Sequence, residues 1–380
     1  MDWIPLPQPP TVGIMSEPLR RTPLHGFHLD HNARMVPFAG WEMPVQYLSI
    51  MEEHRAVRTH AGLFDVSHMG EARIHGAEAR QFLDFLLPNN LGRLEVGRAL
   101  YSPMCTADGG VVDDLLVYQV GDEEYLLCLN AANTTKDLLH MEEHRRGFDC
   151  IVDDVSDDFG LLALQGPRAI ALLGELTGLD FGGLKRFRFV RESIFGTNAI
   201  LSRTGYTGED GLEMYLPAGE SARVANLIYE GTKDEGVQLA GLGARDSLRL
   251  EAGLPLYGHE LSAEIDPLSG GIGWTVRFSE KGDFLGRKAL EAKKAAGLAR
   301  KVAFFTLDNR RIARAESIIL DREGNGRGHV LSGTMSPILN KPIGSALVDT
   351  AALEAGNELY VQLRGHLVPV RFTRPPLHKA

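Results

Sequence analysis

Two adjacent aspartates, Asp113 and Asp114, lie within the apolar run GGVVDDLLVY. The run predicts a strand that follows a glycine turn, and side chains alternate between the two faces of a strand, so the two carboxylates must point opposite ways. In a strand this apolar, at least one of them is expected to face protein rather than water. A carboxylate in such a setting needs a partner and its pKa tends to rise, which suits it to share a proton with a ligand nitrogen.

The next strand indicates which aspartate faces inward. The run EYLLCLNAAN follows after only GDE. If GDE forms a three-residue hairpin loop, the numbers of paired residues sum to 244, and Asp114 faces Asn130. The Asn130 amide can then hydrogen-bond the carboxylate, and Tyr118 shares the same face. We therefore predict that Asp114 is the inner aspartate. The strand alone leaves open the alternative that both aspartates are structural.

A second candidate for ligand binding is the stretch SRTGYTGEDGLEMYL, in which Tyr206 lies between glycines. This spacing predicts a tight turn that presents an aromatic ring, followed by a strand that carries Glu213 among apolar neighbours. A ring beside a carboxylate can hold a flat heterocycle with amino groups, by stacking and by accepting hydrogen bonds. The alternative, which this stretch alone favours, is a hairpin with a surface tyrosine.

The stretch GLGARDSLRLEAG predicts a helix that begins near Ala244 and ends before Gly253. Arg245 lies in its first turn, where the positive end of the helix dipole disfavours a cation. Residues that break a local rule are often functional. Arg245 is thus a candidate to bind the carboxylate of a ligand. The alternative, which the sequence favours, is a salt bridge to Glu251 or Asp246.

Three weaker patterns are set aside. The histidines of HGFHLDH, residues 25–31, have the spacing of a metal cluster, but no acidic ligands complete it, and a surface turn or helix explains them better. The DVSH stretch, residues 65–68, has the residue types of a hydrolase triad, but such close neighbours cannot adopt the relay geometry. SGGIGW and GLGARD fall short of a dinucleotide fingerprint.

Composition limits the class of protein. The chain has 380 residues, which predicts two or three domains, and a net charge of −10, which argues against a duplex nucleic-acid binder. No apolar run is long enough to span a bilayer. The three cysteines are far apart, so neither a disulfide framework nor a thiolate zinc site is encoded, and a reducing compartment is expected. Residues 1–18 contain five prolines and predict a disordered leader, ahead of an alternative start at Met15.

The elements that must position these residues have an α+β rhythm. Ser49 and Glu52 form a capping box that predicts a helix over 50–60. Beyond about Leu298 the sequence changes to short β runs, which predict a separate barrel or sandwich. The remaining predicted elements are a strand over 71–75, a helix over 77–87, strands at LLALQG and GLEMYL, and helices near 167–177 and 219–231.

Eight motifs in a fixed order closely resemble the aminomethyltransferase (T-protein) family of the glycine cleavage system, over roughly residues 20–373. They are MVPFAGWEMPVQY, GLFDVSHMGE, GGVVDDLLVY, LNAAN, SRTGYTGEDGLEMY, GLGARDSLRLEAGLPLYG, GWTVRF and SGTMSPILNKPIGSALV. The resemblance implies a three-domain α+β cloverleaf: two interleaved α+β domains around a folate channel, residues 19–297, and a C-terminal β-barrel, residues 298–380.

The resemblance also implies an activity. The family transfers the one-carbon unit from the aminomethyl-lipoyl arm of the H-protein to tetrahydrofolate, which releases ammonia and forms 5,10-methylenetetrahydrofolate. The implied partners are the lipoylated H-protein and tetrahydrofolate, and neither a metal, a nucleic acid nor a membrane is implied. The expected location is the cytoplasm, or the mitochondrial matrix in a eukaryote.

The resemblance assigns roles to single residues. The catalytic aspartate of the family falls on Asp114, in agreement with the strand-face argument. Glu213 and Asn130 are implied to bind the pterin edge, Tyr206 to lie against it, and Arg245 to lie near the active carbon. The folate contacts of the family fall on Met69, Tyr101, Tyr118, Asn130, Tyr206, Glu213 and Arg245.

The chain departs from the family at LLPNNLGRL, where an Asn-Asp pair is usual, and at the ending RPPLHKA, which lacks the usual aromatic-containing tail. Two alternatives stay open within the superfamily. One is a folate-dependent demethylase that acts on dimethylsulfoniopropionate. The other is a non-catalytic folate-binding factor for iron-sulfur assembly, but Asp283 stands where that branch carries a cysteine.

Overall fold

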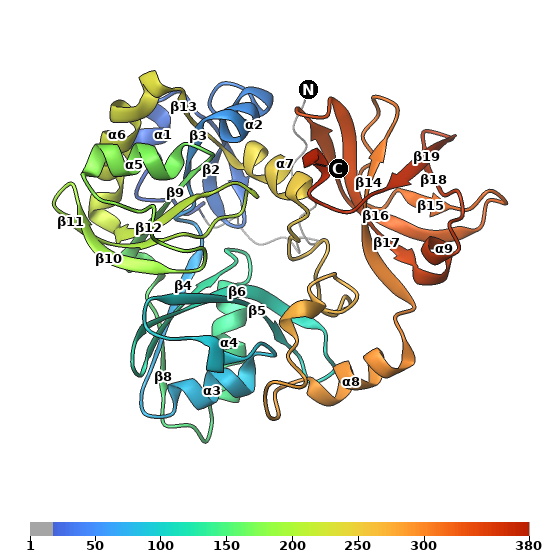
Figure 1. Cartoon of the computed structure of the whole chain (residues 1–380), viewed down its shortest axis with the longest axis horizontal. Coiled ribbons are helices and arrows are strands. Elements are labelled where there is room, and N and C mark those ends of the chain that lie inside the picture. Colours follow the sequence, from blue (N-terminus) through green and yellow to red (C-terminus); the bar gives the residue numbers. More distant parts are fainter. Residues whose placement is uncertain (1–17, 380) are drawn as a thin grey trace.

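The computed structural model describes residues 18–379, and these residues form three lobes (Figure 1). Two lobes are built on open sheets and the third on a closed barrel. The α+β cloverleaf expected from the family resemblance is thereby confirmed. The predicted leader, apart from its last residue, and the start at Met15 lie outside the described residues. The helices are α1 (His25–Asp30), α2 (Ile50–Thr59), α3 (Ala79–Leu86), α4 (Thr134–His144), α5 (Ala169–Thr177), α6 (Ala218–Thr232), α7 (Leu242–Ala252), α8 (Arg287–Ala296) and α9 (Thr350–Glu354).

The first lobe holds a six-stranded sheet of order β10-β11-β12-β9-β3-β13, in which only the β13–β3 pair is parallel. The next strand of this sheet along the chain is β9, which follows β3 only after a long insertion. Its strands are β3 (Ala61–Asp65), β9 (Phe159–Gln165), β10 (Phe189–Ile194), β11 (Thr197–Ser202), β12 (Gly211–Pro217) and β13 (Val237–Leu239).

The insertion forms the second lobe, an antiparallel five-stranded sheet of order β5-β6-β7-β4-β8. The two sheets are therefore interleaved along the chain. The strands of the second sheet are β4 (Gly70–His75), β5 (Arg98–Cys105), β6 (Val111–Gly121), β7 (Glu124–Leu129) and β8 (Ile151–Asp154), and a separate hairpin precedes both sheets, with strands β1 (Arg34–Phe38) and β2 (Trp41–Gln46).

The third lobe is a closed barrel of order β14-β17-β16-β15-β18-β19. The apolar β runs that predicted it are confirmed, but β16 is an additional strand that the sequence did not predict, because glycines and polar residues interrupt its apolar pattern. The barrel strands are β14 (Arg300–Leu307), β15 (Ile318–Leu320), β16 (Gly326–Ser336), β17 (Lys341–Asp349), β18 (Tyr360–Leu363) and β19 (His366–Phe372).

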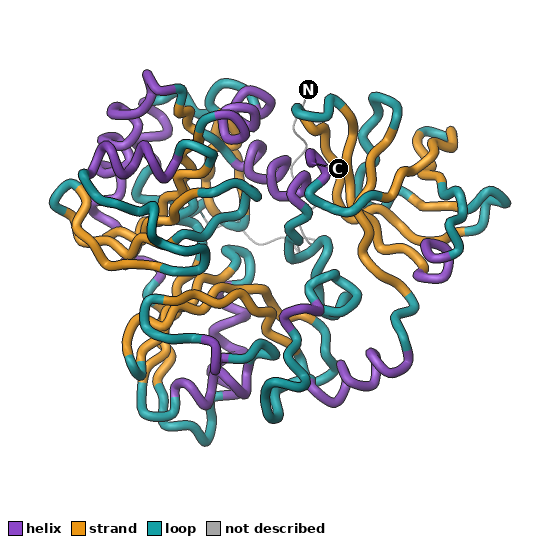
Figure 2. Tube along the Cα trace, in the orientation of Figure 1, coloured by secondary structure: helices purple, strands orange, loops and turns teal. Residues whose placement is uncertain are grey.

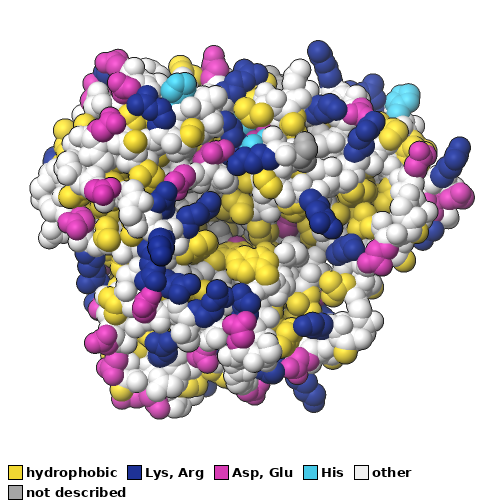
Figure 3. Space-filling model, in the orientation of Figure 1, with side chains coloured by type: hydrophobic (Ala, Val, Ile, Leu, Met, Phe, Trp, Pro, Cys, Tyr) yellow, Lys and Arg dark blue, Asp and Glu magenta, His cyan; other side chains and the backbone are white. Residues whose placement is uncertain are grey.

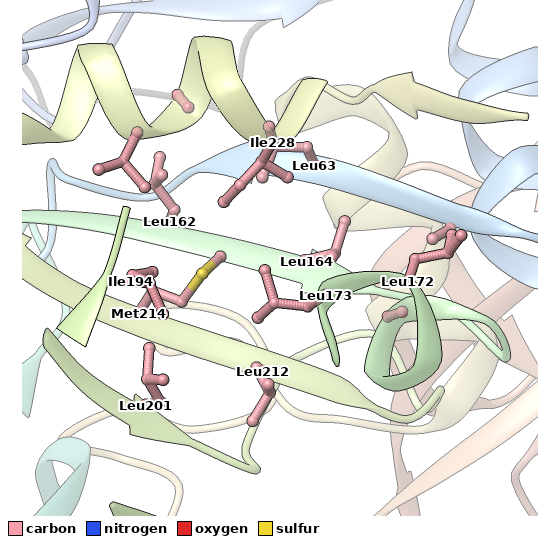
Figure 4. Packing of buried hydrophobic residues seen from close by; sticks show 14 of the residues in the cluster. Leu63, Leu162, Leu164, Leu172, Leu173, Ile194, Leu201, Leu212, Met214 and Ile228 are labelled. Carbon is pink, nitrogen blue, oxygen red and sulfur yellow. The ribbon is translucent and has the colours of Figure 1, made fainter. Parts of the chain in front are cut away.

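Each open sheet has a helical layer on its outer face. Helices α5 and α6 cover the first sheet, where Leu173 and Ile228 pack against Leu63 and Leu164 (Figure 4). Helices α3 and α4 cover the second sheet in the same way. The inner faces of both sheets pack on each other, through side chains such as Tyr118. Protein therefore covers both faces of each sheet, so polar side chains on either face of a strand also lie against protein.

The segment between α7 and α8 connects the sheets with the barrel and is mostly loop (Figure 2). Helix α7 lies between the first lobe and the barrel, and it packs on α2, β2 and β16. Ser49 caps α2 as predicted, since its hydroxyl oxygen accepts a hydrogen bond from the Glu52 amide at 3.2 Å. Within the described part of the chain, no helix is both long and apolar enough to cross a bilayer.

Candidate active site

The hairpin of β6 and β7 has the predicted register over most of its length. Tyr118 pairs with Leu126 and Leu116 with Cys128, so the residue numbers sum to 244. The loop prediction is wrong, because the register shifts by one residue beside Gly121 and only two residues form the turn. The irregularity absorbs the residue that a three-residue loop would have held. Strand β6 continues past the end of β7, which leaves its two aspartates beside the loop that follows β7.

The two aspartates point to opposite faces of the second sheet, as the alternation predicts. The structure differs from the prediction that Asp114 alone faces protein, because both aspartates do: Asp113 is fully buried, and Asp114 is partly buried. The physical reason is that both faces of this sheet are covered. Asp113 points toward the helical layer, and Asp114 points toward the inner face, on the same side of β6 as Tyr118.

Asn130 holds both carboxylates. Its side-chain amide donates to Asp113 Oδ1 at 2.9 Å and to Asp114 Oδ1 at 3.2 Å, and its backbone amide donates to Asp113 Oδ2 at 3.1 Å. The predicted contact between Asn130 and Asp114 is therefore present. Tyr101 Oη donates to the other Asp114 oxygen at 2.8 Å, from the neighbouring strand β5. Two side-chain donors, one on each oxygen, thus fix the plane of the Asp114 carboxylate.

The surroundings of Asp114 change its proton affinity. Burial and the neighbouring charge of Asp113 raise its pKa to about 7, against the opposing effect of the hydrogen bonds from Tyr101 and Asn130. A carboxyl group with a pKa near neutrality is populated in both protonation states at physiological pH. Asp114 can therefore accept and return a proton.

Tyr206 lies in the loop before β12, and glycines give this loop its shape. Gly208 has φ +80°, and a Cβ on Gly205 would lie 1.9 Å from the side-chain oxygen of Gln165. The chain can therefore turn tightly on both sides of Tyr206. The alternative of a free surface tyrosine is wrong: the ring is half-buried, its hydroxyl donates to the Pro255 carbonyl, and the guanidinium of Arg245 lies 4.7 Å from the ring centre.

Glu213 follows on β12 and is almost completely buried, with 7% of its surface exposed. Thr204 Oγ1 donates to its Oε2 at 2.5 Å, and burial raises its pKa, which the Thr204 bond and the charge of Arg245 partly offset. Tyr118 is fully buried, and its hydroxyl lies 3.3 Å from the same Thr204 oxygen. The structure thus places Tyr118 behind Glu213 and Thr204, where it supports the wall of the site.

Arg245 has no ion-pair partner among residues 18–379, so the predicted salt bridge is wrong. Asp246 pairs with Arg249 at 2.9 Å, and Glu251 pairs with Arg58 at 2.8 Å. Residues one and six positions away from Arg245 lie on other faces of the helix, which explains why neither reaches it. Arg245 instead lies against Tyr206 and close enough to Glu213 to lower its pKa.

The space-filling view shows a hollow in the middle of one face, with hydrophobic and acidic side chains at depth and Lys and Arg along much of its rim (Figure 3). In the ribbon view, β5, β6 and α7 lie near the middle of the molecule (Figure 1). Met69 lies at the border of the core between the two sheets and is half-buried. Trp274, which the sequence analysis did not single out, is 56% exposed and stacks on Tyr101 with 6.0 Å between ring centres. A tryptophan directly after the glycine-rich GGIG was the sequence signal that could have found it.

The patterns that were set aside have structural partners. His28 bonds Asp65 at 2.8 Å and His25 bonds Glu42 at 2.9 Å. In residues 18–379, no group of three or more His, Cys, Asp or Glu side chains could hold a metal ion. The ring of His68 is buried, and burial lowers its pKa to about 3, so it is neutral.

Two family models match the chain. The GCVT N-terminal domain matches residues 24–280, and the glycine cleavage T-protein C-terminal barrel domain matches residues 300–379. The second match covers the six strands of the closed barrel. The two matches together cover both sheets, most of the loop between α7 and α8, and the barrel.

Three similar proteins are named as aminomethyltransferases. An aminomethyltransferase of Desulfitobacterium hafniense (strain Y51) is 46% identical over 353 residues, which is 93% of this chain and 96% of that protein. An aminomethyltransferase of Bacillus subtilis is 44% identical over 362 residues, 95% of this chain and 99% of that protein. The crystal structure of glycine cleavage system aminomethyltransferase T from Bartonella henselae superposes with a TM-score of 0.88 at 34% identity, and covers 94% of this chain and 98% of that one.

Proposed function

The chain belongs to the glycine cleavage T-protein family, and on that premise we propose that the residues around Asp114 carry its aminomethyltransferase reaction. The chain is a transferase of the glycine cleavage system. The observation that carries the assignment to Asp114 is its position: a carboxylate with a pKa near 7, held by Tyr101 and Asn130 and close to Tyr206 of the loop before β12. A demethylase and a non-catalytic folate-binding factor are not favoured, because the similar proteins are aminomethyltransferases.

The reaction exchanges a carbon–sulfur bond for carbon–nitrogen bonds. The aminomethyl carbon on a lipoyl sulfur is transferred to the two nitrogens of tetrahydrofolate, N5 and N10. Both N–H protons leave the folate: one ends on the sulfur as a thiol, and the other leaves with the amino group as ammonia. No electrons are gained or lost. The protein must therefore orient two substrates and move protons, and neither task needs a covalent intermediate.

Asp114 suits the proton transfer at N10. As a carboxylate it accepts the N10 proton, and this leaves N5 well placed to attack the aminomethyl carbon. Tyr101 and Asn130 keep the carboxylate oriented while its charge changes, because each is a hydrogen-bond donor to one of its oxygens. Fixed donors of this kind reduce the reorganisation that accompanies proton transfer.

The pterin ring is proposed to lie between Tyr206 and the wall that holds Glu213. Glu213 is almost buried and has an open acceptor position beside its bond to Thr204, which suits it to bind the amino group and ring N–H of a pterin edge. Arg245, which has no carboxylate partner among residues 18–379, is free to attract an anionic group of the substrate. Met69 and Trp274 supply apolar surface next to these polar groups.

The lipoylated H-protein is proposed as the donor of the aminomethyl group. The chain is proposed to divide into two interleaved domains, residues 19–297, and a barrel domain, residues 298–380. Support for this division comes from the sheets, since β14 is the first strand of the barrel and begins at Arg300. Support for the donor comes from the family, whose members act in the glycine cleavage system.

A coupled assay tests the proposed function. The protein is mixed with tetrahydrofolate and aminomethylated H-protein, and ammonia and 5,10-methylenetetrahydrofolate are followed together. The expected result is the appearance of both products in equal amounts, at a rate far above that of a mixture without the protein. Products at the uncatalysed rate, or ammonia without methylenetetrahydrofolate, would contradict the proposal.

A further inference from the structure

A second acidic pair lies beneath the proposed site, on the opposite face of β6. Asp113 on β6 and Asp137 on α4 are both fully buried. The proposed chemistry uses neither of them. Two buried carboxylates in one place are unfavourable unless each is compensated, because burial and like charge both disfavour ionisation. The partners of each carboxylate therefore indicate which one carries the charge.

Asp113 is surrounded by N–H donors. It accepts from the backbone amide of Asn130 at 3.1 Å, from the side-chain amide of Asn130 at 2.9 Å, and from the side-chain amide of Asn133 at 2.6 Å. An ionised carboxylate is an acceptor only, so this arrangement matches Asp113 in its charged form. Asn133 is in turn fixed, because its oxygen accepts from Lys136 Nζ at 3.0 Å.

Asp137 has the opposite surroundings. Neither of its oxygens has a hydrogen-bond partner within residues 18–379. Lys136 is its neighbour in sequence, but its ammonium group is bound to the carbonyl of Val112 and lies over the ring of Tyr257. Burial raises the pKa of Asp137 to about 11, and the charge of Asp113 and its capacity to accept a hydrogen bond from a protonated Asp137 act in the same direction. Asp137 therefore carries a proton, and Asp113 is the acceptor within its reach.

We propose that Asp113 and Asp137 are a pair of positioning residues, in which the protonated Asp137 donates to the charged Asp113 and Asp113 sets the orientation and charge state of Asp114 through Asn130. Two links connect the pair to the site. The Asn130 side-chain nitrogen contacts an oxygen of each adjacent aspartate. The negative charge of Asp113 is itself a cause of the raised pKa of Asp114, second only to burial. This inference rests on the proposed role of Asp114.

The other groups that face Asp114 do not supply this effect. Tyr101 from β5 and Asn130 lower its pKa by hydrogen bonding. Tyr206 lies near it from the loop before β12, and burial raises the pKa of that hydroxyl, which stays neutral. From α7, Arg245 and Arg249 face Tyr206. Asp113 is therefore the group whose removal lowers the pKa of Asp114 most directly.

Two amide variants separate this role from a purely structural one. In Asp113→Asn/Asp137→Asn neither buried group can be charged, so the pKa of Asp114 and the acidic limb of the pH–rate profile are expected to move down by about one to two pH units. In Asp137→Asn the new amide still donates to a charged Asp113, so the limb is expected to stay where it is in the parent protein. Asp122→Asn, in the exposed turn of the same hairpin, is the matched control and is also expected to leave the limb in place.

The titration is read directly by carbon NMR of the Asp114 carboxyl, assigned by its loss in Asp114→Asn. Unchanged titration of Asp114 in the double variant, or an equal shift in all three variants, would overturn the proposal. Because this measurement needs no turnover, its failure is distinct from failure of the coupled assay, which tests the proposed function itself.

An infrared measurement covers the case in which the double variant does not fold. The difference spectrum between the parent protein and Asp137→Asn at neutral pH is expected to contain the carbonyl band of one protonated carboxylic acid. Asp137→Leu removes the proposed hydrogen-bond donor to Asp113. Its spectrum is expected to lack this band, and its turnover is expected to be lower than that of the parent protein, whereas Asp137→Asn is expected to retain turnover. Absence of the acid band, or equal turnover in the Leu and Asn variants, would show that Asp137 does not hold the proton.

Discussion

Asp114 combines a fixed position with a pKa near neutrality, and each property has its own cause. Position comes from two donors, the Tyr101 hydroxyl and the Asn130 amide, on different oxygens of the carboxylate. Proton affinity comes from burial and from Asp113, a charge on the other face of the same strand. A neutral isostere at Asp114 would keep the shape of the site and lose the proton acceptor, so a substitution there separates binding from chemistry.

We predict that Asp114→Asn lowers turnover by about 10²–10⁴-fold, the range that proton transfer by a positioned side chain contributes. The amide occupies the same space, so the dissociation constant for tetrahydrofolate is expected to change by only a few-fold. The measurements are single-turnover kinetics with aminomethylated H-protein and equilibrium binding of the folate. Loss of folate binding with little loss of turnover in the bound state would assign Asp114 to recognition instead.

At the scale of the element, the loop before β12 positions Tyr206 through its glycines. A Cβ on Gly208 would lie 2.5 Å from the Ala252 Cβ, at a backbone φ of +80° that disfavours any side chain. This close approach joins the loop to the last turn of α7. The position of Tyr206 relative to Arg245 therefore depends on a glycine that packs against the end of α7.

Gly208→Ala is expected to displace this loop and to raise the KM for tetrahydrofolate several-fold, with a smaller effect on kcat, because the loop is proposed to bind the pterin and not to transfer a proton. Steady-state kinetics with varied folate concentration measures both parameters. Gly219→Ala is the matched control, since Gly219 in α6 has open space around its Cβ position and no positive φ. Equal changes in both variants would contradict the role of the loop.

Helices α2 and α7 are joined by one buried carboxylate. Glu251 on α7 accepts from Arg58 at 2.8 Å and from His54 at 3.1 Å, both on α2, and from the Ser336 hydroxyl of β16. Burial alone would raise its pKa, but the bonds from His54 and Ser336 and the charges of His54 and Arg58 lower the pKa of Glu251 to about 2. In the folded protein, these interactions therefore stabilise the ionised form of Glu251 more than its protonated form.

Because the folded pKa of Glu251 lies below its unfolded value, its contribution to stability is complete above about pH 4.5 and is lost as the pH falls toward 2. The contribution is about 3 kcal/mol. We predict that Glu251→Gln loses this acid-dependent part, so that its unfolding midpoint in denaturant falls less steeply with pH than that of the parent. Glu142→Gln, which removes an exposed ion pair with Arg145, is the control and should retain the parental slope.

At the scale of the whole molecule, the features that the sequence predicted are those with local causes. Ser49 caps α2 through the neighbouring turn, and the barrel strands follow from alternating apolar runs between turn residues. The register of the β6–β7 hairpin followed from the short spacing between two apolar runs. The contact of Asn130 with Asp114 could be predicted for the same reason, because both residues lie close to that hairpin.

The features that the sequence did not predict depend on elements distant along the chain. The burial of Asp113 depends on α4, and the stacking of Trp274 on Tyr101 depends on a loop more than 150 residues away. Arg245 was expected to pair with a neighbour in its own helix, but its environment comes from the loop that carries Tyr206. Such contacts are set by tertiary packing, on which local patterns carry no information. The roles of the folate-contact residues remain predictions.

A buried cation joins α7 to the barrel. Arg249 is 1% exposed; it bonds Glu260 at 2.8 Å, in the loop that follows α7, and Ser332 of β16 at 2.9 Å. Glu260 is itself fully buried and also accepts from Ser345 of β17. Removal of one member of such a pair leaves the other charge buried without compensation, which is more costly than removal of both.

We predict that Arg249→Leu destabilises the protein by about 3–5 kcal/mol, because it leaves Glu260 charged and buried. The thermal midpoint is expected to fall, and limited proteolysis to cut the loop between α7 and α8 before the barrel unfolds. Arg249→Leu/Glu260→Leu should recover much of the lost stability, since no uncompensated charge remains. Arg300→Leu, which breaks the exposed pair with Asp349, serves as control and should change stability by less than about 1 kcal/mol. A double variant as unstable as the single one would mean that packing of the arginine stem, rather than charge compensation, joins the barrel to the two sheets.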